Sequence, residues 1–108
     1  MFAFASRTET QGLVLLEAMA QGAPVVSTAE LGTRSILKPG CGAIVVEEKQ
    51  DEFAAAVVRV LQDPALQKEL GDRGRAYART WTSASMARRL ADLYDSVRLS
   101  AKASRVIA

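Results

Sequence analysis

The first 27 residues alternate between short apolar segments and one segment of strong helix formers, and this order limits the possible folds more than any other feature. Residues 2–5 (FAFA) and 25–27 (VVS) are typical of buried strands, whereas residues 12–21 (GLVLLEAMAQ) favour a helix. Gly22 is placed to end that helix, and Pro24 prevents its continuation. Two strands joined through a helix run parallel, so the sequence predicts a parallel α/β sheet.

One further strand follows, and the rest of the chain is predicted to be helical. A helical turn at residues 33–37 ends at Pro39-Gly40, and residues 43–46 (AIVV) form the third strand. The later helices are expected from a cap at Asp51 to about Gln62, from Pro64 to about Arg79, and from a break at residues 81–83 to Ser100. We expect one α/β domain over residues 1–100, with about three parallel strands flanked by helices, and a frayed tail over residues 101–108.

Helical spacing also predicts which side chains face the core. The expected inward residues are Leu13, Leu16 and Ala20 in the first helix, Phe53, Val57, Val60 and Leu61 after Asp51, Leu66, Leu70 and Tyr77 after Pro64, and Met86, Leu90, Leu93, Tyr94 and Val97 in the last helix. Gly71 and Gly74 lie inside the helix that begins at Pro64, and we expect them to weaken it.

Composition excludes several kinds of site. The chain has no histidine, which rules out a histidine-based triad, a histidine-ligated zinc ion and a histidine general base within these residues. Cys41 is the only cysteine, so no intrachain disulfide can form, and this favours a reducing compartment, the cytoplasm. No window reaches the ~20 apolar residues of a transmembrane helix.

Charge gives no sign of a dedicated nucleic-acid surface. The 14 basic and 12 acidic residues leave a formal net charge of +2, and we expect no nucleic-acid partner. Residues 49–108 carry 11 Lys or Arg against 7 Asp or Glu. We interpret this excess as solvated helix faces, with peripheral docking at the inner face of the membrane as the alternative.

The most informative segment runs from Ser6 to Val26. There a strand leads into a polar loop, then into Gly12, then into a helix. The first N–H groups of a helix are unpaired and carry partial positive charge, so such a helix start is a natural site for anions, most often phosphate. Gly12 has no side chain, so a ligand can approach the backbone closely. Ligands of open α/β sheets bind beyond the carboxyl ends of the strands, where this loop is expected.

Two carboxylates flank this helix start. Glu9 lies in the loop and Glu17 follows within the helix; at ~1.5 Å rise per residue, Glu17 lies about 8 Å along the helix from Gly12. Carboxylates accept hydrogen bonds and suit hydroxyl groups, so a diphosphate at the helix start could have one acid for sugar hydroxyls and one for ribose hydroxyls. Two interpretations stay open: a nucleotide-sugar site, or a helix-capping Glu9 with Glu17 as an ordinary surface residue.

The segment SRTETQGLVLLEAMAQGAPVV resembles the E-x7-E motif of the retaining GT-B glycosyltransferases of family 4, the glycosyl transferases group 1. The family pattern is roughly S-x-x-E-x-x-G-L-x-x-x-E-A-M-A-x-G-x-P-V-V, and every element of it is present. Residues 41–46 (CGAIVV) and the helical segments after Asp63 resemble the end of the family's C-terminal domain. The resemblance implies a partial Rossmann-like fold, the C-terminal donor-binding part of a GT-B enzyme.

The family implies a role for each motif residue. Glu9 would be the catalytic residue that holds hydroxyls of the donor sugar near the reacting carbon. Glu17 would bind the ribose hydroxyls, and the backbone of residues 10–13 would contact the sugar and the diphosphate. The implied donor-binding residues are therefore Thr10, Gln11, Gly12, Leu13 and Glu17. The family transfers the sugar with retention of anomeric configuration and usually without a bound metal, so the resemblance implies no metal ligand and no cofactor besides the nucleotide-sugar substrate.

One loop departs from the family pattern. After the second strand the family often has G-G-x-x-E, whereas this chain has Leu31-Gly32-Thr33-Arg34-Ser35. Leu31 stands in place of the first glycine and Ser35 in place of the glutamate, which leaves the identity of the donor sugar open. Arg34 either binds an anion or is simply exposed, and we favour exposure.

The resemblance also implies parts that these 108 residues do not contain. GT-B enzymes have two Rossmann-like domains, and the other domain would bind the acceptor, a glycan or a lipid. An Arg/Lys pair earlier in the donor domain usually neutralises the diphosphate, so we expect the isolated chain to be inactive. A first strand left at the sheet edge favours self-association. The alternative function is a non-catalytic remnant that acts as a folding or interaction module.

Overall fold

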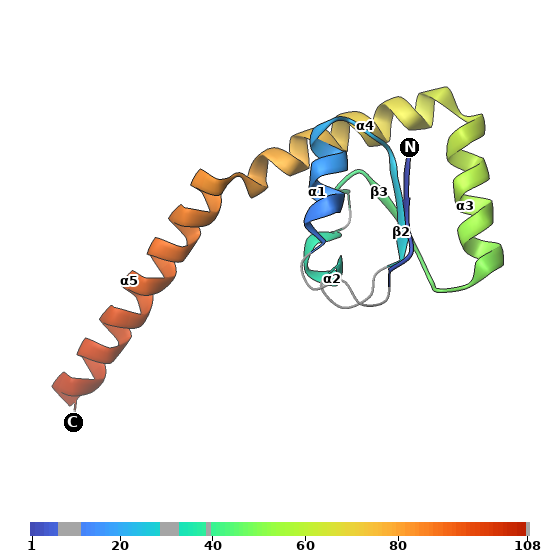
Figure 1. Ribbon diagram of the computed structural model, residues 1–108. Helices are drawn as coiled ribbons and strands as arrows, with labels where there is room; N and C mark the ends of the chain where they lie inside the picture. Colours follow the sequence, from blue (N-terminus) through green and yellow to red (C-terminus); the bar gives the residue numbers. More distant parts are fainter. Residues whose placement is uncertain (7–11, 29–32, 39, 108) are drawn as a thin grey trace.

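A short parallel sheet forms the centre of the protein. The computed structural model describes residues 1–6, 12–28, 33–38 and 40–107. The elements of this part are β1 (Phe2–Phe4), α1 (Leu13–Ala20), β2 (Val25–Thr28), α2 (Thr33–Ile36), β3 (Ala43–Val46), α3 (Gln50–Gln62), α4 (Pro64–Ala78), the 3-10 turn η1 (Arg79–Trp81) and α5 (Ser83–Ile107). The strands pair in parallel in the order β1-β2-β3, with Val25 beside Phe2 and Ala43 (Figure 1). The predicted α/β fold with a three-stranded parallel sheet is confirmed.

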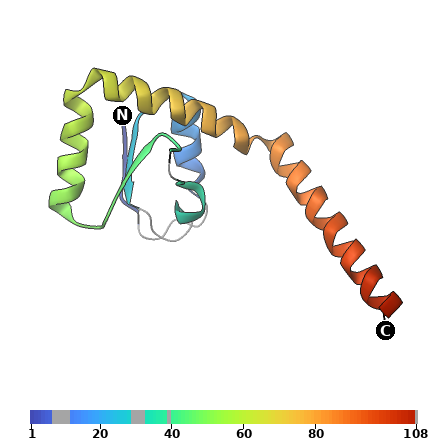
Figure 2. The same ribbon diagram turned by 180° about the vertical axis from the view of Figure 1, so that it is seen from behind.

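Helices cover both faces of this sheet. α1 and α2 lie on one side and α3 on the other, as the two opposite views show (Figures 1 and 2). The core on the α1 side contains Leu15, Leu16, Met19, Val25, Ile36, Leu37 and Cys41. The core on the α3 side contains Val26, Ala56, Val60 and Leu70. Because successive strand residues point to opposite faces, the fully buried Val25 and Val26 of β2 each supply one of the two cores.

The buried face of α1 differs from the predicted one. We expected Leu13 and Ala20 to point inward with Leu16, but Leu13 is 55% exposed and Ala20 is exposed as well. Leu15 and Met19 are fully buried instead. The helix reads LVLLEAMA, so apolar residues surround almost its whole circumference and their spacing cannot single out one face.

Two expectations for α3 were also wrong. The helix begins at Gln50 after Lys49, so Asp51 lies in the first turn rather than at the cap. A carboxylate in that turn is still favourable, because the helix start carries partial positive charge. Leu61 is 59% exposed. The buried face centres on Ala56 and Val60, and Leu61 lies beyond the edge of that face.

The predicted starts of the last two helices are confirmed. The backbone N–H of Leu66 donates to Oδ1 of Asp63 at 3.0 Å, with Pro64 as the first residue of α4. At the start of α5, the backbone N–H of Ser85 donates to Oγ1 of Thr82 at 3.1 Å. Both caps are local interactions between residues three apart. The Asp-Pro pair predicts the first, whereas the break at residues 81–83 left two possible caps for the last helix, Thr82 and Ser83.

The two glycines of α4 lie where the helix backbone approaches other segments closely. A Cβ atom on Gly71 would lie 2.5 Å from the carbonyl oxygen of Gly22, and a Cβ atom on Gly42 would lie 2.2 Å from the backbone nitrogen of Gly74. Gly22 follows α1 and Gly42 precedes β3, so α4 crosses the end of the sheet where β2 and β3 begin (Figure 1). The missing side chains of Gly71 and Gly42 therefore let backbones touch, a role that the sequence did not indicate.

Helix α5 projects from the rest of the structure. The described part of the chain measures 62 × 26 × 18 Å, because α5 extends away from the sheet-containing part (Figures 1 and 2). The predicted inward stripe is uncovered: Leu90, Leu93, Tyr94 and Val97 are all classed among the exposed apolar side chains. The helix also continues to Ile107, past Ser100, where we expected a frayed tail to begin.

Substituting Gly42 by alanine tests the contact with α4. Gly42→Ala places a Cβ against the backbone of Gly74 at a φ of +95°, so we expect it to lower the free energy of unfolding by about 3 kcal/mol, from overpacking and left-handed strain together. The control is Gly40→Ala, at a φ of +77° with no atom within 4 Å of the new Cβ. It adds strain alone, about 1 kcal/mol. Urea denaturation measures both, and equal losses would contradict the contact.

Substituting Tyr77 by phenylalanine tests the link between α4 and α2. The Tyr77 hydroxyl donates to the carbonyl oxygen of Ile36. Tyr77→Phe removes this donor and is expected to lower the free energy of unfolding by about 1 kcal/mol. Tyr94→Phe is the matched control, since Tyr94 is 65% exposed, and should change stability by less than ~0.5 kcal/mol. The interpretation fails if thermal unfolding shows the two variants to be equally stable.

Candidate functional site

The start of α1 is shaped by a glycine in a conformation that other residues rarely adopt. Gly12 is buried and precedes α1 with φ 65° and ψ 29°, in the left-handed region. Its carbonyl accepts a hydrogen bond from the N–H of Leu15 at 3.0 Å, which begins the helix. The first turn of α1 contains no acidic side chain. The positive end of the helix therefore lies at the edge of the sheet where the strands end. No acidic side chain in the first turn of α1 neutralises it.

The structure describes only half of the predicted site residues. Glu9, Thr10 and Gln11 lie outside the described residues, and their roles stay predictions. Gly12, Leu13 and Glu17 are described. Leu13 and Glu17 are four residues apart and therefore lie on one face of α1. Because Leu15 and Met19 are buried, that face is exposed.

A shallow hollow lies beside Glu17. It has a volume of about 270 Å³ and is lined by Leu13, Leu16, Glu17, Ala20, Ala78 and Trp81. Glu17 is exposed, and within the described parts of the chain its carboxylate has no ion-pair or hydrogen-bond partner. A carboxylate beside an apolar surface suits a ligand that has both hydroxyl groups and an apolar face.

Trp81 is held in this hollow by its neighbours. Its ring meets that of Tyr77 edge-on, with centroids 6.5 Å apart, and Cζ of Arg89 lies 5.7 Å from its centroid. We did not assign Trp81 or Ala78 to the site from the sequence, because α4 and η1 lie some 60 residues after α1. The one available signal was that Trp81 is the only tryptophan, at a predicted helix break.

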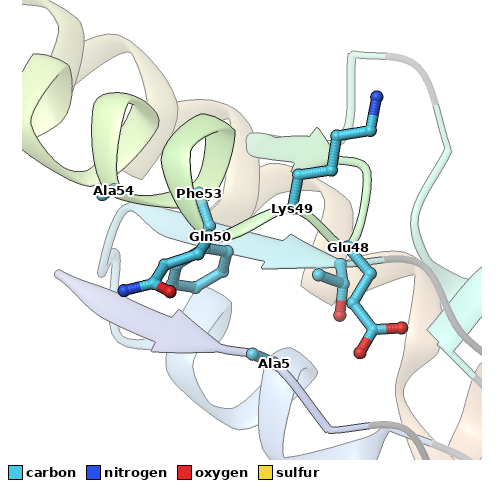
Figure 3. A pocket seen from close by; sticks show the side chains of 7 residues that line it. Ala5, Glu48, Lys49, Gln50, Phe53 and Ala54 are labelled. Atoms are coloured by element: carbon cyan, nitrogen blue, oxygen red, sulfur yellow. The ribbon is translucent and has the colours of Figure 1, made fainter.

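A second hollow, of about 370 Å³, lies on the opposite face of the sheet (Figure 3). It is lined by Ala5, Thr28, Glu48, Lys49, Gln50, Phe53 and Ala54. The ring of Phe53 lies within it, whereas the Lys49 ammonium points away from that ring (Figure 3). Nζ of Lys49 lies 3.3 Å from a Glu47 carboxylate oxygen and 3.7 Å from one of Glu52. We assign the candidate site to the hollow beside Glu17 instead, because Leu13 and Glu17 of the predicted motif line it.

The remaining predicted features can be placed briefly. Arg34 is exposed, as we favoured, while Leu31 and Gly32 lie outside the described residues. Over residues 1–6, 12–28, 33–38 and 40–107, no group of three or more Cys, Asp or Glu side chains is placed to hold a metal ion. No helix in the same ranges is both long and apolar enough to cross a membrane.

Comparison with characterised sequences gives a consistent result. A curated relative in Corynebacterium glutamicum, a GDP-mannose-dependent monoacylated alpha-(1-6)-phosphatidylinositol monomannoside mannosyltransferase, is 30% identical over 104 residues. The aligned segment covers 89% of this chain and 27% of that protein. The chain thus spans about a quarter of the length of this relative.

Solved structures share the fold. Sucrose-phosphate synthase (tll1590) from Thermosynechococcus elongatus superimposes with a TM-score of 0.71 at 27% identity, covering 91% of this chain and 26% of that one. Anabaena Alr3699/HepE, solved in complex with UDP, gives a TM-score of 0.72 at 20% identity, covering 87% of this chain and 27% of that one. The mixed α/β arrangement is similar to that of GT-B glycosyltransferase structures.

The family assignment rests on the part of the chain that contains the sheet, α1 and α4. The sequence profile of the family described as "Glycosyl transferases group 1" matches residues 1–77. That range includes Gly12, Leu13 and Glu17 and amounts to more than two thirds of the 108 residues. The chain belongs to the glycosyl transferases group 1 family.

Proposed function

We propose that this chain is the donor-binding portion of a retaining glycosyltransferase that transfers a sugar from a nucleotide-diphosphate sugar to a glycan or lipid acceptor. The observation that carries the proposal is the placement of Glu17, exposed beside the Trp81 hollow and on the same helix that begins at Gly12. The family membership supports sugar transfer as the reaction class. The names of the relatives support the donor class, since one is described as GDP-mannose-dependent and another was solved with UDP.

The donor would extend along α1 from its start. Its diphosphate would lie at the N–H groups after Gly12, where the helix dipole favours negative charge. Its ribose hydroxyls would reach Glu17, about 8 Å further along the helix axis. The carboxylate would accept hydrogen bonds from both hydroxyls, and the apolar surface of Leu13 and Trp81 would exclude water from one side.

Glu9 and its neighbours complete the proposal. Glu9 would hold hydroxyls of the donor sugar near the reacting carbon, while Thr10 and Gln11 would contact the sugar and diphosphate through their backbone. As the family resemblance implies, the proposed reaction uses no metal ion and no cofactor besides the nucleotide-sugar substrate. We place the protein in the cytoplasm, where the buried Cys41 would stay reduced, and expect peripheral membrane contact where the acceptor is a lipid.

A second candidate function is that of a non-catalytic interaction module. The uncovered apolar stripe on α5 favours it, because a soluble chain rarely leaves such a stripe open unless something binds there. Donor binding would involve the surface of α1, whereas the interaction module would use the surface of α5.

Titration with UDP and with GDP tests donor binding by the 108-residue chain. We expect backbone amide shifts at Gly12, Leu13 and Glu17, with millimolar affinity, about −4 kcal/mol, unchanged by EDTA. Glu17→Gln should weaken binding ~10-fold or more, because it removes charge-assisted hydrogen bonds. It should alter the free energy of unfolding by less than ~0.5 kcal/mol, since Glu17 is exposed.

The matched control is Glu52→Gln, which neutralises an exposed glutamate on α3. It should leave the NMR titration unchanged. Shifts confined to residues 49–107, or equal affinities for the two variants, would contradict the placement of the donor on α1.

The isolated chain is expected to be catalytically inactive. It contains the proposed donor site but spans about a quarter of the length of its relatives. The residues that line the proposed donor site include no cation that would neutralise the diphosphate. The proposed site also contains no place for the acceptor. Incubation with radiolabelled UDP-sugars or GDP-sugars and lipid or glycan acceptors should yield no labelled product above a blank. Robust transfer by the 108 residues alone would overturn this expectation.

A further inference from the structure

Tyr77 connects two segments that lie far apart in the sequence. It belongs to α4 and packs against the core on the α1 side, and its hydroxyl donates to the carbonyl oxygen of Ile36, the last residue of α2. Its ring meets that of Trp81 edge-on, with the centroids 6.5 Å apart. Trp81 in turn lines the hollow beside Glu17. One half-buried side chain thus contacts both a wall of the candidate site and α2.

Helix α2 lies at the edge of the sheet where ligands are expected. It begins at Thr33, soon after β2 ends at Thr28. Figures 1 and 2 both show α2 beside the end of α1 at which that helix begins. Ile36 and Leu37 are buried in the same core as Leu15 of α1. Because ligands of open α/β sheets bind beyond this edge, α2 borders the position proposed for the diphosphate.

A hydrogen bond can fix α2 in a way that apolar contacts cannot. A helix of four residues is not stable by itself, so the position of α2 depends on its contacts with other segments. Apolar burial is non-directional, whereas a hydrogen bond requires a particular direction and distance. The carbonyl group of Ile36 lies at the end of α2, where backbone carbonyls have no partner within the helix. The Tyr77 hydroxyl satisfies that carbonyl and thereby ties α2 to α4.

We propose that Tyr77 is a positioning residue of the donor site, whose hydroxyl holds α2 beside the diphosphate. This inference rests on the donor placement proposed above, with the ribose at Glu17 and the diphosphate at the start of α1. Tyr77 touches no part of the donor in that placement and acts through the backbone of α2. The outer phosphate lies further from Glu17 than the inner one, toward α2. Loss of the hydroxyl therefore weakens contacts with the outer phosphate and leaves those with the ribose in place.

Tyr77→Phe keeps the ring, removes the hydroxyl and tests this role in the whole 108-residue chain. NMR titrations with UMP and UDP, and with GMP and GDP, give a dissociation constant for each nucleotide. We expect the variant to raise the constant for the diphosphate ~5-fold or more and that for the monophosphate less than ~2-fold, because only the second phosphate reaches α2. In the wild type, the diphosphate but not the monophosphate should shift the amide resonances of Ile36 and Leu37, and the variant should lose these shifts.

Gln67→Met is the matched control for the loss of stability. Gln67 is also a half-buried side chain of α4, and its Nε2 donates to the carbonyl oxygen of Val60 in α3 at 2.8 Å. Its replacement removes one donor to a backbone carbonyl, as Tyr77→Phe does, so urea denaturation should show similar losses of stability for the two variants. Gln67→Met should change the constants for both kinds of nucleotide less than ~2-fold, because α2 keeps its contact with Tyr77.

The outcomes separate the role of Tyr77 from donor binding itself. Equal diphosphate affinities in the wild type and in Tyr77→Phe would overturn the inference and leave the proposed donor site standing. An equal loss for monophosphate and diphosphate, or the same loss in Gln67→Met, would also overturn it, since Tyr77 would then only stabilise the fold. A wild-type chain that binds none of the four nucleotides would contradict the proposed function, and this inference with it.

Discussion

The close contact between α4 and the amino edge of the sheet is the constraint on which the rest of the structure depends. Gly71 lies against the backbone of Gly22, and Gly74 against that of Gly42. This contact lets one helix serve both cores: Leu70 packs on the α3 side, while Tyr77 and Ala78 pack on the α1 side. Because interiors are close-packed, a side chain on Gly71 or Gly42 would collide with backbone and push α4 away from the sheet.

The position of α4 also decides how α1 is turned. Met19 packs against Gly74, so the face of α1 that carries Leu15 and Met19 is buried. Glu17 is then left on the outer face, where Ala78 and Trp81 border the same hollow. The contact of α4 with the amino edge of the sheet thus decides which face of α1 is exposed. That face carries Leu13 and Glu17, and α1 begins at the carboxyl edge of the sheet. Stability and ligand binding occupy opposite ends of the same strands.

The exposed surfaces fit a chain that corresponds to about a quarter of its relatives' length. Within the described residues β1 pairs only with β2, and α5 packs mainly against η1. The first is a strand edge with open backbone groups, and the second is an apolar stripe without charges.

Local interactions made much of this structure predictable from the sequence. The strands and their parallel direction follow from apolar runs and helix connections. The cap at Asp63 follows from a side chain that bonds to backbone three residues away. The motif from Ser6 to Val26 likewise indicated the family. Glu9, Thr10 and Gln11 lie outside the described residues, so their part of the site stays a prediction.

Other features depended on contacts between distant segments. Spacing could not choose the buried face of α1, because apolar residues surround most of that helix. The spacing of apolar residues showed that α5 is amphipathic, but not that its stripe is uncovered. Residue type marked Gly71 and Gly74 as weak helix formers, but not as points of close backbone contact. Sequence determined the elements, their order and the motif, because short-range chemistry controls them. Only the tertiary structure decided which faces meet, because that depends on how closely α4 can approach backbone some 30 to 50 residues away.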